Sequence, residues 1–268
     1  MKRVVSAVIL GGAFVALLLA APRAPGAAGV AVAVLIAAHE MAALLERAGA
    51  NLPRVPAVAA GSLVLAGAWA AGVAGMSAGL AVGLGIIFAS EVLTGTSKGS
   101  VTRVSGGFLL ILLPVWSLAH LILYLESETT RRSLLFLLLC VWVCDSAAFY
   151  VGSTMGKHKL APGISPNKTV EGSVAGVLGS VAAALLMRAV SLVTWPVAFV
   201  LFAGAVIAVL AQLGDLAESM IKRDAGVKDS GNLIPGHGGV LDRVDALLFT
   251  VPVFYYALLL LRGLGGGG

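Results

Sequence analysis

Residues 57–94, AVAAGSLVLAGAWAAGVAGMSAGLAVGLGIIFASEVLT, form one apolar run whose only charged residue is Glu91. About 20 apolar residues are enough to carry a helix across the hydrocarbon core of a bilayer. The run is therefore too long for a single span, and we predict two spans, 57–75 and 78–94, joined by a turn at Gly75-Met76-Ser77. The pattern indicates an all-α fold, a polytopic transmembrane helical bundle.

Apolar stretches of similar length flank this run on both sides, which brings the predicted number of spans to about nine. They cover residues 4–21, 28–45, 105–125, 134–151, 173–191, 197–214 and 245–261. The first stretch also resembles a cleaved signal peptide, but its apolar core is longer than usual and we expect a retained helix. The whole chain, 1–268, is predicted to be one integral membrane domain with a frayed glycine-rich tail at 263–268.

Composition supports this class. Of the 268 residues, 59% are hydrophobic and 12% are charged, whereas soluble domains have about 25% charged residues. A water-soluble protein and a disordered chain are thereby excluded. The formal net charge of +5 suits loops that meet anionic headgroups, so no nucleic-acid partner is expected. Cys140 and Cys144 lie one helical turn apart in an apolar stretch, and we expect buried thiols rather than a disulfide or a zinc site.

The basic residues predict the orientation in the cell membrane. Thirteen of the 18 Lys and Arg residues fall at the N-terminus and in the even-numbered loops of the nine-span topology. Because positively charged loops stay in the cytoplasm, the N-terminus is expected there. The two longest polar loops, 152–172 and 215–244, would lie on the same cytoplasmic side.

Polar residues gather in segment 212–245, QLGDLAESMIKRDAGVKDSGNLIPGHGGVLDRVD. Asp215, Ser219 and Lys222 stand at i, i+4 and i+7, so on a helix they share one face. Acids at the end of a membrane span are functional candidates by default. The stretch that follows, up to Gly239, is broken by Gly and Pro and cannot stay helical.

Two further acids, Asp242 and Asp245, lie three residues apart at the start of the next helix. If the two helix ends meet, these acids converge with Asp215. Carboxylate oxygens are the ligands that Mg²⁺ prefers, often together with substrate phosphates. Basic residues are interleaved with the acids: Lys222, Arg223, Lys228 and Arg243. Acids for a metal ion and bases for phosphate oxygens indicate phosphoryl or nucleotidyl transfer.

The order of these residues resembles the signature of the phosphatidate cytidylyltransferase (CDP-diacylglycerol synthase) family. The matching positions are Ser219, Lys222-Arg223, Lys228-Asp229, Pro235, His237-Gly238-Gly239, Asp242-Arg243 and Asp245. A second stretch, 145–172, resembles another motif of this family, with Phe149 in place of the commoner Tyr. Its matching positions are Asp145, Ala148, Phe149, Gly152, Ser165-Pro166, Lys168-Thr169 and Glu171-Gly172.

The resemblance implies transfer of a cytidylyl group from CTP to phosphatidate, with Mg²⁺ required and a second cation compatible with the site. We predict that Asp215, Asp242 and Asp245 hold the metal. The predicted catalytic residues are Asp215, Ser219, Lys222, Asp242 and Asp245. The residues predicted to bind the substrates are Arg223, Lys228, Asp229, His237, Arg243, Asp145, Ser165, Lys168, Thr169 and Glu171. The attacking phosphate monoester has a second pKa of about 6, so no general base is needed.

Other functions stay open at this point. A related enzyme could use CTP with an ether lipid phosphate or a polyprenol. A transporter would place its polar groups near the bilayer midplane, whereas here they gather at helix ends on one side. Small residues in the spans are compatible with a homodimer. Four polar residues inside spans receive no assigned role: His39, Glu40, Glu91 and His120.

Overall fold

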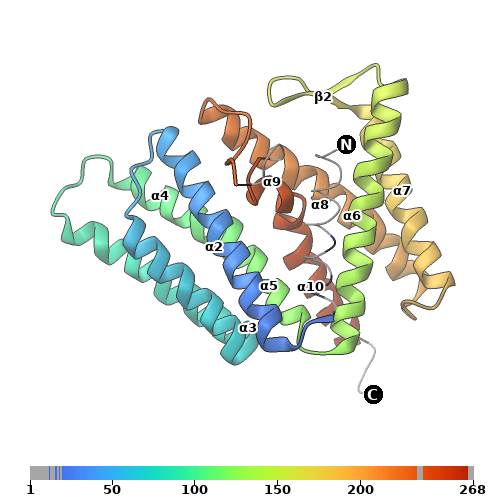
Figure 1. Cartoon of the computed structure of the whole chain (residues 1–268), viewed down its shortest axis with the longest axis horizontal. Helices are drawn as coiled ribbons and strands as arrows, with labels where there is room; N and C mark the ends of the chain where they lie inside the picture. Colours follow the sequence, from blue (N-terminus) through green and yellow to red (C-terminus); the bar gives the residue numbers. More distant parts are fainter. Residues whose placement is uncertain (1–11, 13–15, 17, 19, 234–237, 265–268) are drawn as a thin grey trace. The chain divides into compact units, whose positions relative to one another are not determined.

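The structure is a computed structural model that describes residues 12, 16, 18, 20–233 and 238–264 (Figure 1). Among these residues, seven helices are long and apolar enough to cross a membrane, which confirms a polytopic helical membrane protein. The chain forms two compact units, residues 1–126 with 221–244 and residues 127–220 with 245–268. Most of the predicted first span, 4–21, lies outside the described residues. The prediction that it is a retained helix is therefore not tested.

The first unit is built from helices separated by short loops. Its elements are α2 (Arg23–Arg47), α3 (Arg54–Leu93), α4 (Ser100–Leu110), the π-helical turn η1 (Ile111–Trp116), α5 (Ser117–Tyr124) and the short α9 (Leu241–Val244). The π-helical turn contains Pro114. Proline has no backbone N–H and cannot continue the regular α-helical ladder, and a wider turn accommodates it. Helices α4 to α5 run on without a break, as the predicted span 105–125 requires.

Helix α3 folds back on itself. Its backbone leaves the helical region at Ala71 and at Gly72, which has a φ of 59°. Beyond this point the chain returns along its own first half, and Gly79 lies against the backbone of Leu63. Two antiparallel segments in 57–94 are therefore confirmed, but the predicted turn at Gly75-Met76-Ser77 is wrong. The chain reverses at Gly72 instead, because glycine adopts a positive φ without a steric penalty.

The close approach of the two segments of α3 leads to a prediction about stability. A Cβ atom on Gly79 would lie 2.5 Å from the carbonyl oxygen of Leu63, whereas one on Gly85 would meet nothing within 4 Å. We expect Gly79→Ala to lower the free energy of unfolding by about 1–3 kcal/mol, the usual cost of overpacking. Gly85→Ala should be neutral or slightly stabilising, because alanine is the better helix former. Thermal unfolding in detergent compares the two variants, and equal midpoints would contradict the hairpin.

The second unit contains four long helices and a small hairpin. The helices are α6 (Glu128–Met155), α7 (Val170–Ala189), α8 (Val197–Asp224), of which residues up to 220 belong to this unit, and α10 (Leu247–Leu264). Phe136 of α6 stacks on Phe254 of α10, with ring centroids 5.7 Å apart. Cys140 and Cys144 are free and buried, as predicted. Because α10 ends at Leu264, the first two residues of the predicted frayed tail are helical, and residues 265–268 lie outside the described part.

An antiparallel β-hairpin in this unit corrects the strictly all-α prediction. Strand β1 (Lys159–Ala161) pairs with β2 (Ser165–Thr169). Ser165 is extended before Pro166, as a residue preceding proline should be. Thr169 then caps α7, since its hydroxyl accepts a hydrogen bond from the N–H of Gly172 at 3.2 Å. Strands this short carry too little alternation of polar and apolar residues to be predicted from the sequence.

Candidate active site

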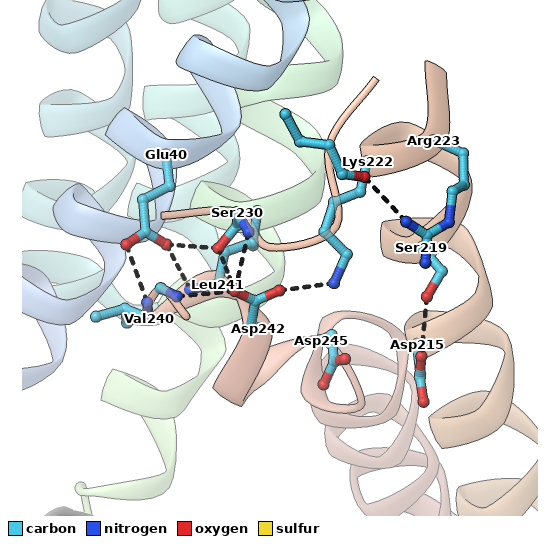
Figure 2. A network of polar contacts seen from close by, with 12 residues as sticks. Glu40, Asp215, Ser219, Lys222, Arg223, Ser230, Val240, Leu241, Asp242 and Asp245 are labelled. Atoms are coloured by element: carbon cyan, nitrogen blue, oxygen red, sulfur yellow. Dashed lines mark hydrogen bonds and ion pairs between the residues drawn. The ribbon is translucent and has the colours of Figure 1, made fainter. Parts of the chain in front are cut away.

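The two motif segments meet within the second unit. Lys168, near the end of β2, places its Nζ 2.7 Å from Oδ2 of Asp215 on α8. Ser219, one turn further along α8, donates a hydrogen bond of 3.2 Å to Oδ1 of Asp215 (Figure 2). The predicted common face of Asp215 and Ser219 is thus confirmed. The Asp215 side chain is 38% exposed, so its carboxylate is open to a ligand.

A second acid lies close to this ion pair. Asp145, on α6, interacts electrostatically with both Asp215 and Lys168. The ammonium group of Lys168 therefore interacts with two carboxylates, those of Asp145 and Asp215. Such a group of charges has an excess of negative charge, and a bound cation would compensate it.

The remaining residues of the second motif hold the hairpin in place. Glu171, in the first turn of α7, accepts hydrogen bonds from the backbone N–H groups of Lys157 and His158, at 3.1 and 3.2 Å. Its Oε1 also lies 2.6 Å from Nδ1 of His158. Thr169 is buried and uses its hydroxyl as the helix cap. In this structure, Glu171 and Thr169 bind protein groups, and they keep Lys168 directed at α8.

Asp245 lies in the turn between α9 and α10. Its Oδ1 accepts a hydrogen bond of 2.7 Å from the N–H of Ala246. Gly214 of α8 packs directly against the carbonyl group of Asp245, where a Cβ atom would collide with the oxygen. The start of α10 therefore lies against the turn of α8 that carries Asp215.

In the first unit, the centre of the signature is a buried ion pair. Nζ of Lys222 lies 2.6 Å from Oδ1 of Asp242, and the two side chains are only 10% and 7% exposed. The other oxygen, Oδ2, accepts hydrogen bonds from the N–H groups of Ser230 and Gly239, at 2.9 and 2.8 Å, and lies 2.9 Å from the Ser230 hydroxyl (Figure 2). Both oxygens of this buried carboxylate are thus satisfied, as a buried charge requires.

The other basic residues of the signature are exposed. Arg223 donates a hydrogen bond of 3.0 Å to the carbonyl oxygen of Val227 and so closes the turn after α8. Lys228 and Arg243 are exposed, as is the acid Asp229. Exposed cations beside a buried ion pair suit an anionic substrate that arrives from water. The predicted site residue His237 and the neighbouring Pro235 lie outside the described residues.

Residues 1–261 match the model of the cytidylyltransferase family. The chain belongs to this family. Among its relatives, a Bacillus subtilis (strain 168) protein named phosphatidate cytidylyltransferase is 47% identical over 120 residues, which is 45% of each chain. A Synechocystis protein of the same name is 49% identical over 124 residues, covering 46% of this chain and 41% of the relative.

A Staphylococcus epidermidis (strain RP62A) protein, also named phosphatidate cytidylyltransferase, is 39% identical over 163 residues. That alignment covers 61% of this chain and 63% of the relative. The chain thus spans between about two fifths and two thirds of the length of these relatives. The resemblance inferred from the two motifs is confirmed at the level of the family.

Sequence reasoning missed two residues of the candidate site, Glu40 and Ser230. Glu40 is an acid inside a membrane helix, which is a signal for function, but its partners lie about 190 to 200 residues further along the chain. Ser230 sits between the carboxylates of Glu40 and Asp242. Neither contact can be derived from spacing.

The residues predicted to hold a metal, Asp215, Asp242 and Asp245, would offer carboxylate oxygens. No group of three or more His, Cys, Asp or Glu side chains forms a metal centre among the described residues. Asp215 and Asp242 are each paired with a lysine instead. Oxygen donors of this kind fit Mg²⁺ and do not fit a soft metal such as Zn²⁺ with thiolate ligands.

Proposed function

We propose that the protein is an enzyme that transfers the cytidylyl group of CTP to phosphatidate and releases pyrophosphate and CDP-diacylglycerol. One observation carries the proposal: each unit holds a lysine–aspartate pair built from the family motifs, Lys168 with Asp215 and Lys222 with Asp242. Membership of the family and relatives named phosphatidate cytidylyltransferase support it.

The chemistry requires charge neutralisation more than proton transfer. The phosphate of phosphatidate is a monoester that is largely dianionic at neutral pH, and it must approach the α-phosphate of a second anion. Cationic side chains that hold both groups in line lower this barrier. In this proposal, Lys168 and Lys222 would each exchange a carboxylate partner for phosphate oxygens. The exposed Arg223, Lys228 and Arg243 would bind the rest of the triphosphate.

Asp215, Asp242 and Asp245 are the residues proposed to hold Mg²⁺, and a second cation is compatible with the same acids. Their oxygen donors fit this ion. When bound, Mg²⁺ neutralises phosphate charge and orients the triphosphate for in-line attack. In the chain alone, the charges of Asp215 and Asp242 are balanced by Lys168 and Lys222.

We further propose nine spans with the N-terminus and the active site on the cytoplasmic side, where CTP is made. The excess of Lys and Arg in the even-numbered loops supports this orientation. The small residues of the spans support a homodimer, which crosslinking in membranes would test.

The orientation predicts a labelling pattern. Asn232, after α8, and Thr129, in the first turn of α6, are both exposed and are assigned to opposite sides of the membrane. In a chain whose Cys140 and Cys144 are replaced by alanine, Asn232→Cys should react with an impermeant thiol reagent only in inverted vesicles. Thr129→Cys should react in sealed cells. The reverse pattern would overturn the proposed topology.

Pyrophosphate release from CTP tests the function itself. We expect release by the purified protein to require both phosphatidate and Mg²⁺. Release with an ether lipid phosphate or a polyprenol acceptor, but not with phosphatidate, would identify a related enzyme with another lipid. Absence of release with all acceptors would contradict the proposal and favour a transporter.

A further inference from the structure

Glu40 is a buried carboxylate on α2 whose partners all belong to the signature segment. It is 6% exposed. Its Oε1 accepts a hydrogen bond of 3.0 Å from the N–H of Val240, and its Oε2 accepts one of 2.8 Å from the N–H of Leu241. These N–H groups lie at the beginning of α9. Glu40 therefore caps this short helix from another part of the chain (Figure 2).

Ser230 connects Glu40 with Asp242. Its hydroxyl lies 3.0 Å from Oε2 of Glu40 and 2.9 Å from Oδ2 of Asp242. A hydroxyl group has one proton, so it donates fully to only one of the two carboxylates at a time. The positions of the two acids are thereby coupled through one side chain.

The two carboxylates bind three successive backbone N–H groups. Gly239 donates to Asp242, while Val240 and Leu241 donate to Glu40. Backbone N–H groups in a glycine-rich turn are a common binding site for phosphate. Here the protein's own acids accept the hydrogen bonds of these three N–H groups.

The glycines of the turn fit the same arrangement. A Cβ atom on Gly239 would collide with Oε2 of Glu40, and one on Gly231 would lie 2.8 Å from Oε1. Gly238 has a φ of +79°, and a Cβ atom there would collide with Oδ2 of Asp242. The two glycines of the signature are therefore explained by the close approach of the two acids.

We propose that Glu40 is a positioning residue for the proposed cytidylyl transfer. It holds Ser230 and the backbone of Val240 and Leu241 in place and thereby keeps the carboxylate of Asp242 directed at Lys222. Glu40 contacts no substrate in this assignment. The inference rests on the proposed function because Asp242 is one of the residues proposed to act in it.

Glu40→Gln is the direct test, since it keeps the size of the side chain but replaces one acceptor oxygen by an NH₂ group. We expect kcat to fall about 10- to 100-fold, the usual effect of losing a residue that orients a ligand-binding group. The KM for CTP should change less than kcat does, because Glu40 itself contacts no substrate in this assignment. Glu40→Asp keeps both acceptors and should restore part of kcat.

Glu46→Gln is the matched control. Glu46 lies on the same helix, but its carboxylate pairs with Arg54. We expect its activity to stay within about twofold of wild type. A loss of kcat as large as that of Glu40→Gln would show a general effect on α2 and overturn the proposal.

Two further measurements examine the coupling. Ser230→Ala and Glu40→Gln should be non-additive in kcat, because they break the same chain of hydrogen bonds. Hydrogen exchange should show faster exchange of the Val240 and Leu241 amides in Glu40→Gln but not in Glu46→Gln. Additive effects, or unchanged exchange, would overturn the assignment.

Hydrogen exchange also separates the two proposals, because it does not need activity. A wild-type protein that releases no pyrophosphate would contradict the proposed function. Unchanged protection of the two amides in Glu40→Gln would contradict the role of Glu40, whatever the activity of the wild type.

Discussion

Replacing Asp242 by asparagine is expected to lower kcat/KM by about 10²- to 10³-fold. This is the usual effect of removing a group that stabilises charge in the transition state. Asparagine has nearly the same shape but cannot balance a cation. Because Lys222 and Asp242 are both buried, the substitution also leaves an ammonium group without its counter-charge. We therefore expect a loss of about 3–5 kcal/mol in the free energy of unfolding.

A double substitution separates the two effects. Asp242→Asn combined with Lys222→Met removes both charges, and we expect it to regain most of the lost stability. Activity should stay as low as in the single variant, because the carboxylate is still absent. Thermal unfolding and pyrophosphate release are measured on the same samples.

Arg131→Met serves as the control for this pair, since Arg131, in the first turn of α6, is assigned to the outer side. It should leave both measurements near the wild-type values. Recovery of activity in the double variant would show that Asp242 serves only to neutralise Lys222. Activity of Asp242→Asn within tenfold of wild type would remove Asp242 from the proposed metal site.

The part of the site that could be predicted from the residues alone is the part that depends on the spacing of residues along one helix. Asp215 and Ser219 are four residues apart on one helix, so helical geometry alone brings their side chains together. The ion pair between Lys168 and Asp215 joins residues 47 positions apart on different elements. Periodicity contains no information on such a contact, and only the resemblance to a family placed both residues in one site.

The position of the turn within α3 could not be predicted from the sequence, for a different reason. Residues 67–85 contain several glycines, and each of them could reverse the chain. The position of the turn depends on which glycines allow the two segments to pack, since Gly67 and Gly75 lie against each other's backbone. Tertiary packing therefore decides among local alternatives that are nearly equal in the sequence.

The role of Glu40 could not be predicted from the sequence either, because it depends on tertiary packing. From the sequence, it is one of several polar residues in apolar spans, together with His39, Glu91 and His120. The structure distinguishes them. Glu91 pairs with Arg103, twelve residues away, whereas Glu40 binds three groups of the signature segment. A contact across some 200 residues is set by the packing of α2 against α9, which no local pattern encodes.

Asp215→Asn should lower turnover by about 10²-fold with little change in stability. The side chains of Asp215 and Lys168 are 38% and 24% exposed, so their ion pair is worth at most about 1 kcal/mol. Because the Asp215 carboxylate is open to solvent, its charge is available to a bound cation. We therefore expect the Mg²⁺ concentration that gives half-maximal activity to rise in this variant.

Asp224→Asn is the matched control, because Asp224 is an exposed acid at the end of the same helix and outside the family pattern. It should alter neither turnover nor the Mg²⁺ requirement. Lys168→Met frees the Asp215 carboxylate but removes a cation for phosphate, so it should raise the KM for CTP without raising the Mg²⁺ requirement. If Asp215→Asn and Asp224→Asn gave equal Mg²⁺ titration curves, Asp215 would not be a metal ligand. Its pairing with Lys168 would then serve only to hold the β-hairpin against α8.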